Sequence, residues 1–536
     1  MNLQKVNQYF YTLKYMKFKQ IRYRLFYTLR TRYRKKIGFS YAYEKDVSLS
    51  QKINFQKSIP AYPSYDKNSQ QDSFTFLNLT HTFDKDIDWN YAELGKLWTY
   101  NLTYFEFLLQ DEIGVDDGLR LIFDFIENIS QVKDGLEPFP IALRGMNWIK
   151  FLTLHDISNS QIDKSLYAQY YILMDNLEYH LLGNHLLENG FSLLFGGYYF
   201  NDEHLYNKAK EILIQELHEQ ILEDGAHFEL TPMYHQIMLY RVLDCINLVR
   251  SNDNFNDANL LGILEEKAAS MLGWLQEMTY KNGSIPHVND STDGIAPVSS
   301  ALFAYANRLG ITTAVKKLSD SGYRKYVTPR YEFLIDIGNI GPDYIPGHAH
   351  SDTFSFELHV DGIPIVKDTG ISTYEANERR ALERSTKAHN TVMIDEFEQS
   401  EVWSSFRVAR RAYIISKEEN SNKLRATHDG YKRQGILHTR SVLHDKNRIV
   451  LTDTLQYKKK SFENAIAYIH FSPDISVKQE KNQIYAQNTI FSFKGLKKLE
   501  LVDITIAEGY NRLRKTKMAK VYFDETLSTS IDIVEL

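Results

Sequence analysis

Three short motifs between Gly347 and Thr391 carry side chains that could bind a metal or move protons. They read Gly-His-Ala-His-Ser-Asp at 347–352, Lys-Asp-Thr-Gly at 367–370 and Lys-Ala-His-Asn-Thr at 387–391. The residues from Phe354 to Val360 alternate strictly between apolar and polar types, which predicts a half-buried strand led in by the first motif. His348 and His350 should then face the same way, because side chains two residues apart lie on one side of a strand.

The chain that follows is predicted to fold back on this strand. Asp361-Gly362 is typical of a two-residue hairpin turn, and a returning strand at 363–366 would bring Asp368 near the histidines. A third segment, 391–394, begins just after His389. Residues from all three motifs are therefore expected on neighbouring strands.

Two imidazoles and a carboxylate on neighbouring strands suit Zn²⁺, which binds His nitrogen and Asp oxygen with near-tetrahedral geometry. We therefore predict His350, Asp368 and His389 as zinc ligands, and we expect His348 beside the metal but free for chemistry. A single His in a strand is more often a hydrogen-bonded polar residue of the core. The prediction depends on the combination of the three residues.

Two further motifs lie in the first half of the chain. Gly-Asn-His-Leu-Leu-Glu-Asn-Gly at 183–190 puts Asn184, His185 and Glu188 on one face of a helix, where they are costly to bury without partners. In the segment 224–235, Thr231 is a suitable N-cap before Pro232, so Tyr234 and His235 fall in the first turn of a helix. The alternative is a core tyrosine with polar residues that cap the backbone.

Arg144, in Leu-Arg-Gly-Met-Asn-Trp at 143–148, could pair with the carboxylate or sulfate of an acidic sugar through its two-pronged guanidinium. A structural salt bridge between helices explains it equally well. His235 and Asn390, which adjoin the other motifs, are further candidates for contact with a substrate.

In this order, the motifs His-Ala-His-Ser-Asp, Asp-Thr-Gly and Ala-His-Asn-Thr-Val resemble the heparinase II/III family of polysaccharide lyases. The resemblance extends to the two earlier motifs and runs from about Trp98 to the C-terminus. It implies an incomplete α/α toroid followed by a C-terminal antiparallel β-sandwich, with an acidic polysaccharide bound between them. It also implies the following roles: catalysis or substrate binding for Asn184, His185, Glu188, Tyr234 and His348, and zinc binding for His350, Asp368 and His389.

The hydrophobic patterns divide the chain into the same parts. Helical spacing prevails in 91–320, as in the apolar residues of 205–222 and 260–278, whereas short strands with period two prevail in 321–536. Periodicity alone leaves a helical bundle and a toroid open, and the resemblance favours the toroid. Residues 1–90 are expected to be a basic N-terminal segment followed by a polar connector over 48–72.

Composition excludes several classes of protein. The formal charge of −5 argues against a general nucleic-acid binder, and Cys245, the only cysteine, cannot form an intrachain disulfide. No apolar run has the length of a signal peptide core or of a membrane span, so the simplest expectation is a cytoplasmic protein, with export by another route left open. The sequence does not indicate an oligomeric state.

The first 43 residues are unusual, because they hold many Lys, Arg, Tyr and Phe residues and no Asp or Glu. Such a basic, aromatic and amphipathic segment could lie on an anionic membrane or dock on a partner protein.

For a lyase, the chemistry would be β-elimination on a uronic acid, in which the C5 proton is removed and the glycosidic oxygen at C4 leaves. Asn184, with a protonated Glu188 or His185, could neutralise the sugar carboxylate. Tyr234 and His348 are the candidate acid and base, and the sequence leaves open which is the base. Zn²⁺ would have a structural or orienting role. The alternatives are a zinc-assisted polysaccharide hydrolase and a non-catalytic polysaccharide-binding protein of an assembly system.

Overall fold

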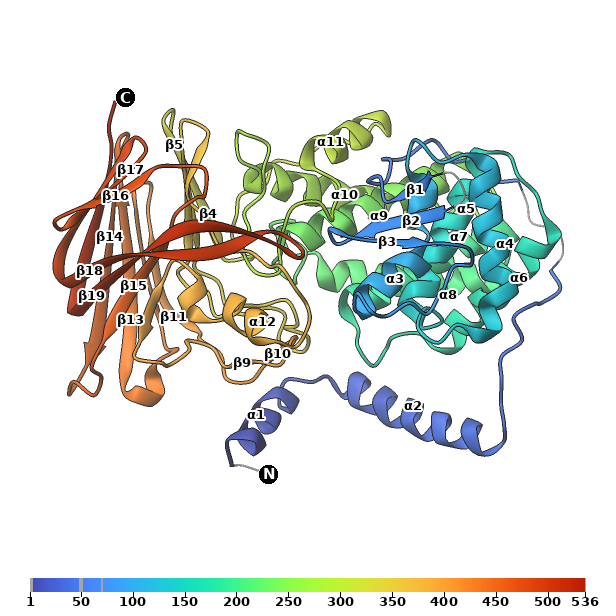
Figure 1. Ribbon diagram of the computed structural model, residues 1–536, viewed down its shortest axis with the longest axis horizontal. Coiled ribbons are helices and arrows are strands. Elements are labelled where there is room, and N and C mark those ends of the chain that lie inside the picture. Colours follow the sequence, from blue (N-terminus) through green and yellow to red (C-terminus); the bar gives the residue numbers. More distant parts are fainter. Residues whose placement is uncertain (1–2, 48–51, 69–70, 536) are drawn as a thin grey trace.

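A helical half and a sheet half lie side by side in the computed structural model, which describes residues 3–47, 52–68 and 71–535 (Figure 1). Two N-terminal helices, α1 (Leu3–Leu13) and α2 (Phe18–Lys36), run below the two halves in this view. The change from helices to strands falls between α11 (Ser299–Arg308) and β4 (Tyr323–Val327). In the described ranges, no helix combines the length and the apolar character that crossing a bilayer requires.

The helical half consists of antiparallel helices joined by short turns. Its main helices are α3 (Lys96–Tyr104), α4 (Val115–Asn128), α5 (Pro138–Leu154), α6 (Ser160–Asp175), α7 (Gly183–Phe200), α8 (Glu203–Gln220), α9 (Pro232–Ser251), α10 (Ala258–Met278) and α11. α7 is buried along nearly all of its length, so it forms the centre of this half. The start of α9 is as predicted: Pro232 is its first residue, and the Thr231 hydroxyl accepts a hydrogen bond from the Tyr234 amide at 3.1 Å.

The connector predicted over 48–72 is in part a sheet, and its residues 48–51 and 69–70 lie outside the described residues. β1 (Tyr65–Asn68), β2 (Gln71–Phe76) and β3 (Leu79–Phe83) form an antiparallel three-stranded sheet. Phe74 and Phe76 of β2 are buried, and the Phe76 ring lies 5.3 Å from that of Trp98 in α3. Burial of these rings against the helical half explains why a segment of polar appearance is ordered.

The sheet half is a sandwich of two antiparallel sheets that share one hydrophobic core. The smaller sheet has the order β4-β5-β6-β7, with β5 (Tyr331–Asp336), β6 (Phe356–Val360) and β7 (Ile363–Val366). The larger sheet has the order β11-β12-β13-β14-β19-β18-β17-β16, and β15 joins β19 to β8. The remaining strands and the short helix of this half are β8 (Val392–Ile394), β9 (Val402–Trp403), β10 (Arg407–Val408), β11 (Ile414–Glu419), β12 (Lys423–His428), β13 (Ile436–His444), β14 (Arg448–Tyr457), β15 (Ala465–His470), β16 (Val477–Glu480), β17 (Gln483–Ala486), β18 (Thr489–Gly509), β19 (Arg512–Ile533) and α12 (Glu378–Glu383).

The predicted hairpin is confirmed, with β6 and β7 antiparallel across Asp361-Gly362, both of which have positive φ. The strand was predicted to begin at Phe354, however, and β6 begins two residues later, at Phe356. Phe354 has φ of 72°, so His348 and His350 precede the strand in a loop. The third segment also differs from the prediction, since β8 pairs with β15 instead of the hairpin.

β18 and β19 form a long hairpin that reaches from the sheet half to the helical half (Figure 1). At its tip, the Asn78 side chain donates to the Tyr510 carbonyl at 2.8 Å, and the Asn511 side chain donates to the Leu77 carbonyl at 3.0 Å. The hairpin thereby ties the two halves together beside the loop that follows β7.

Candidate active site

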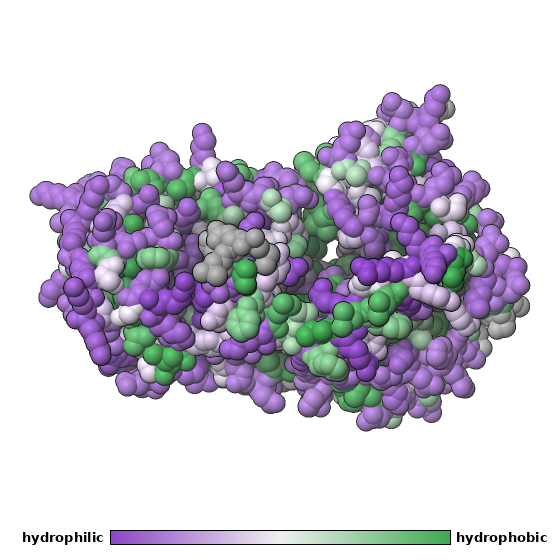
Figure 2. Space-filling view, turned by 90° about the horizontal axis from the view of Figure 1, so that it is seen from below, coloured by the Kyte–Doolittle hydropathy of each residue, from purple (hydrophilic) through white to green (hydrophobic). Residues whose placement is uncertain are grey.

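The loop that carries the first histidine motif lies against residues 289 and 290, which follow α10. Seen from below, the molecule is hollowed between its two halves (Figure 2). The Asp290 amide donates to the His348 carbonyl at 3.2 Å, and the His350 amide donates to the Asn289 side chain at 3.0 Å. The Asn289 side chain in turn donates to the Leu230 carbonyl at 3.0 Å, which holds the loop beside the start of α9.

Tyr234 and His348 meet across the boundary between the halves. Their ring centroids are 4.0 Å apart and the ring planes are tilted by 31°. The Tyr234 hydroxyl lies 3.2 Å from that of Tyr374, which comes from the loop after β7. Burial raises the pKa of Tyr234 above its ordinary value, so its phenol carries a proton at neutral pH.

Asp290 connects the histidines of the first motif. One of its oxygens is 2.8 Å from His348 Nδ1, the other is 2.8 Å from His350 Nε2, and Arg380 donates to both. Burial acts to raise the pKa of Asp290, but Arg380 and the two histidines hold it well below its usual range. A carboxylate only accepts hydrogen bonds, so His348 must carry its proton on Nδ1. In the neutral ring, Nε2 of His348 then keeps a lone pair.

Asn184 belongs to the same cluster through Glu229. Its side-chain amide donates to Glu229 Oε2 at 2.8 Å, and that oxygen is 3.7 Å from His348 Nε2. The structure thus brings Asn184, Tyr234 and His348 to one place, as the sequence motifs predict.

His185 and Glu188 point to partners of their own. His185 Nδ1 is 3.0 Å from Glu178, and the side chain is 36% exposed. Burial lowers the pKa of His185, but the nearby carboxylates, Glu178 first, more than offset this and raise it. Glu188 is buried and accepts a hydrogen bond from Arg241 at 3.2 Å, and burial raises its pKa. The predicted cluster of three is therefore split between the rim of the site and the helical core.

The structure does not bring Arg144 into the site. Arg144 is fully buried and donates to Gln169 at 2.7 Å and to the carbonyls of Thr103 and Gly135, each at 2.9 Å. Burial lowers its pKa to about 9. Its guanidinium holds turns of the helical half together through carbonyl groups, and it forms no salt bridge with the residues that the structure describes.

His235 and Asn390 are fully buried as well. His235 accepts from the His227 amide at 3.1 Å, and its other ring nitrogen is 3.0 Å from the Met271 carbonyl. The Asn390 side chain donates to the Phe356 and Lys367 carbonyls and accepts from the His470 amide. These internal bonds use the polar atoms that a substrate would need, so both residues act in packing here.

The proposed zinc ligands lie close together. His389 Nδ1 is 2.8 Å from Asp368 Oδ2, and the rings of His350 and His389 are 5.2 Å apart. His350 Nδ1, His389 Nε2 and Asp352 Oδ2 are buried with no hydrogen-bond partner among the described residues. Free imidazole nitrogens and a carboxylate oxygen fit a metal ion chemically. Within the described part of the chain, however, no three His, Cys, Asp or Glu side chains are arranged around a common metal position.

Four residues of the site were not identified from the sequence: Glu229, Asp290, Tyr374 and Arg380. Glu229 lies inside the 224–235 motif and could have been chosen with Tyr234. Asp290 and Arg380 are far apart in the sequence and acquire their roles only through the fold, so no local pattern indicates them.

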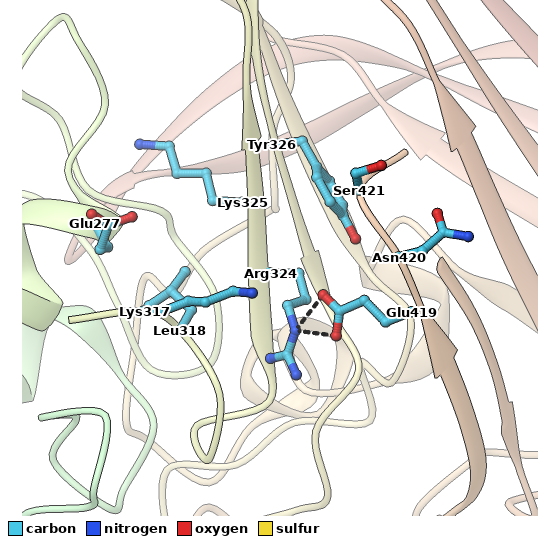
Figure 3. Close-up of a pocket in the computed structure, with 9 residues that line it drawn as sticks. All are labelled: Glu277, Lys317, Leu318, Arg324, Lys325, Tyr326, Glu419, Asn420 and Ser421. Carbon is cyan, nitrogen blue, oxygen red and sulfur yellow. Dashed lines mark hydrogen bonds and ion pairs between the residues drawn. The ribbon is translucent and has the colours of Figure 1, made fainter. Parts of the chain in front are cut away.

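A separate cavity of about 460 Å³ lies between the end of α10 and the sheet half (Figure 3). Arg324, one of its basic residues, has its Nε 3.0 Å from both carboxylate oxygens of Glu419. Lys325, another, is paired with Glu332 at 3.0 Å. None of the clustered site residues lines this cavity, and two of its cations are already neutralised, so it is not the candidate site.

Comparison with known proteins agrees with this architecture. Residues 149–308 match the family described as heparinase II/III N-terminus, and residues 310–532 match heparinase II/III-like, C-terminal. The heparin-sulfate lyase of Bacteroides stercoris is 24% identical over 321 residues, which are 53% of this chain and 46% of that protein. The chain thus spans about half the length of this curated relative.

Two solved structures are similar to the whole fold. The crystal structure of heparinase III has a TM-score of 0.66 at 17% identity, covering 84% of this chain and 80% of that one. A heparan sulfate lyase mutant from Pedobacter heparinus has a TM-score of 0.55 at 17% identity, covering 85% and 80%. The fold is accordingly an incomplete α/α toroid followed by an antiparallel β-sandwich, as the resemblance implied. With both of its halves matched by models of one family, the chain belongs to the heparinase II/III-like family.

Proposed function

We propose that this protein is a polysaccharide lyase that cleaves a uronic-acid-containing chain by β-elimination. The observation that carries the proposal is the contact between Tyr234 and His348, whose rings lie 4.0 Å apart between the two halves. A proton donor and a proton acceptor at this separation can act on the same sugar, as general acid–base catalysis requires. The lyases named among its relatives support the same class of reaction.

His348 is proposed as the base that removes the C5 proton. Asp290 holds the proton on Nδ1, so the lone pair on Nε2 is available to the substrate. Tyr234 is proposed as the acid that protonates the glycosidic oxygen at C4. Its raised pKa favours the neutral phenol, which suits an acid better than a base.

Elimination also requires the sugar carboxylate to be neutralised, since negative charge develops at C5. Asn184 has a second amide N–H beyond the one bound to Glu229, and it can donate to that carboxylate. His185 lies at the rim and nearby carboxylates raise its pKa, which favours the protonated ring that would supply a positive charge nearby. Glu188 is assigned a supporting role, because its pairing with Arg241 links α7 to α9.

Zinc remains part of the proposal, with His350, Asp368 and His389 as the residues that would hold it. Bound there, the ion would fix the loop before β6 to the segment before β8, and Lewis-acid chemistry is not required of it. Asp290 bonds both His350 and His348, so an ordered metal site would also order the proposed base.

The test is to incubate the purified protein with a panel of acidic polysaccharides that differ in sulfation and in uronate epimer. Elimination forms an unsaturated uronate that absorbs ultraviolet light, and hydrolysis does not. We expect absorbance to rise with at least one polysaccharide, and no rise with Tyr234→Phe. Depolymerisation without a rise in ultraviolet absorbance would identify the protein as a hydrolase. Binding without depolymerisation would identify it as a polysaccharide-binding protein.

A further inference from the structure

The N-terminal strap, defined as α1 and α2 with their connecting turn, has an outer face that nothing in the described structure covers. Residues 1–43 contain eleven of the 63 Lys and Arg residues and none of the 68 Asp and Glu residues. The remainder of the chain therefore has sixteen more acidic than basic side chains. A strongly cationic strap is attached to an acidic body.

The inner face of the strap fixes its orientation on both halves (Figure 1). In α1, the Thr12 hydroxyl lies 3.2 Å from the Trp403 indole nitrogen of β9. In α2, Gln20 donates to the Leu181 carbonyl at 3.0 Å, and the Tyr23 ring lies 4.7 Å from that of Tyr179. Further along α2, Arg30 pairs with Asp175 of the helical half. The opposite face of each helix must consequently point away from the protein.

The outer face carries apolar side chains at helical spacing. In α1 they follow the pattern i, i+4, i+7, and in α2 they recur every four or seven residues. Their exposures are Val6 41%, Phe10 62%, Leu13 53%, Phe18 77%, Leu25 61%, Leu29 64% and Tyr33 64%. Tyr9 is not among them, because its ring packs on that of Trp403 on the inner face. Figure 2 views the molecule from this side, and hydrophobic and hydrophilic residues alternate across its middle. Exposed apolar residues in such an ordered row are typical of a binding surface.

Cations alternate with these apolar side chains. Arg22, Arg32 and Lys36 of α2 fall on the same side as Leu25 and Leu29, and all of them are exposed. No ion pair to a carboxylate is seen for these three cations within the described ranges. Arg24 lies near Arg407 of β10; burial, and then the charge of Arg407, lower the pKa of Arg24. Because Arg24 and Arg407 repel each other, an anion bound from outside the protein would be attracted to this pair.

We propose that the strap docks the protein on the surface of a membrane that contains anionic phospholipid, with the apolar row of α1 and α2 inserted at the interface and the cations on lipid phosphates. Basic amphipathic helices bind in this way, through buried apolar area together with attraction to anionic lipid. An acidic polysaccharide would bind the cations but would leave the row of seven apolar side chains without a partner. The inference is independent of the proposed reaction.

The experiment is flotation of the purified full chain with two kinds of vesicle. One contains phosphatidylcholine alone and the other a mixture with phosphatidylglycerol. We expect binding to the anionic vesicles, weakened by added salt because salt screens the charges. Arg22→Glu, Arg32→Glu and Lys36→Glu together should lower partitioning by about 100-fold or more. The matched control changes Lys417, Lys446 and Lys478, exposed on the sheet half, to Glu and should bind as the unaltered protein does.

A second variant, Leu25→Ser with Leu29→Ser, distinguishes the other possible occupants. Both side chains are exposed in the protein, so the fold should persist. Vesicle binding should fall at least about tenfold, because the two leucines can no longer bury apolar area in the membrane. The proposal is overturned if neither vesicle is bound. It is also overturned if only an acidic polysaccharide is bound, with the serine variant unaffected. A dimer in sedimentation that dissociates in the serine variant would assign the face to a second copy of the chain instead.

Discussion

The ring centroids of Tyr234 and His348 lie 4.0 Å apart, although Tyr234 is in the first turn of α9 in the helical half and His348 is in a loop of the sheet half. Neither half alone contains both groups, so the proposed chemistry requires the interface between them. The long hairpin β18–β19 and the strap each contact both halves and hold this interface in place.

Tyr234→Phe should reduce kcat by about 100-fold or more, because it removes only the hydroxyl that protonates the leaving oxygen. Thermal stability and substrate affinity should change little. Tyr62→Phe, which removes a partly exposed phenol outside the cluster, is the matched control and should retain full activity. Retention of more than about a tenth of kcat by Tyr234→Phe would exclude the acid role.

Asp290→Asn should lower both stability and activity. The change leaves the buried Arg380 without its carboxylate, which typically costs about 3–5 kcal/mol. It also releases the constraint that keeps the proton of His348 on Nδ1. Chemical denaturation and steady-state kinetics measure the two effects. Asp293→Asn, three residues away with a side chain 59% exposed, loses only its pairing with His287 and should cost less than Asp290→Asn. Equal losses in both variants would contradict the role given to Asp290.

One zinc ion per chain should copurify with the protein. His350→Ala, Asp368→Ala and His389→Ala should each lower the metal content and the temperature of unfolding, since a bound ion stabilises the folded state. Elemental analysis and calorimetry measure these quantities without reference to activity. His428→Ala, which removes a buried histidine of the sandwich, should lower stability without loss of metal. Active protein free of any divalent metal would refute the ligand assignment.

The sandwich should lose stability in acid through Asp453. Burial acts to raise the pKa of this carboxyl, but Arg440 at 2.7 Å and His438 at 2.8 Å hold it well below its usual range. In the unfolded chain an Asp titrates at about pH 4. The contribution of Asp453 to the free energy of unfolding is therefore fully present above that pH, and it is lost as the pH falls through the lower pKa of the folded state. Asp453→Asn should destabilise the protein most at neutral pH, and the difference should shrink in acid. A difference in urea midpoint that does not change with pH would contradict this assignment.

Local patterns predicted those parts of the fold that depend on local chemistry. The Asp361-Gly362 turn and the Thr231-Pro232 helix start were found as expected, since each is determined by a few adjacent residues. Period-two patterns predict short strands in the sheet half, whereas β18 is one strand from Thr489 to Gly509. Its polar residues belong to the continuous strand, which has register shifts near Gly495, and only pairing with β19 reveals this.

The site was predicted only in part, because some of its residues belong to local motifs and others come together only through the fold. Tyr234, His348 and Asn184 stood out because their motifs are unusual, and the resemblance gave them roles. Arg144 was a candidate ligand-binding residue because the residues around it in the sequence do not indicate that it is buried among carbonyl groups. Asp290 was missed because its partners, His348, His350 and Arg380, are all distant in the chain.

The most direct measurement is mass spectrometry of the products formed from an acidic polysaccharide in water labelled with heavy oxygen. Elimination at the uronate between Tyr234 and His348 predicts fragments whose new non-reducing end is one water molecule lighter than a saturated sugar, with no solvent oxygen incorporated. Tyr234→Phe and His348→Ala should each form little of this product. Saturated fragments that carry the heavy oxygen would contradict elimination and identify the reaction as hydrolysis.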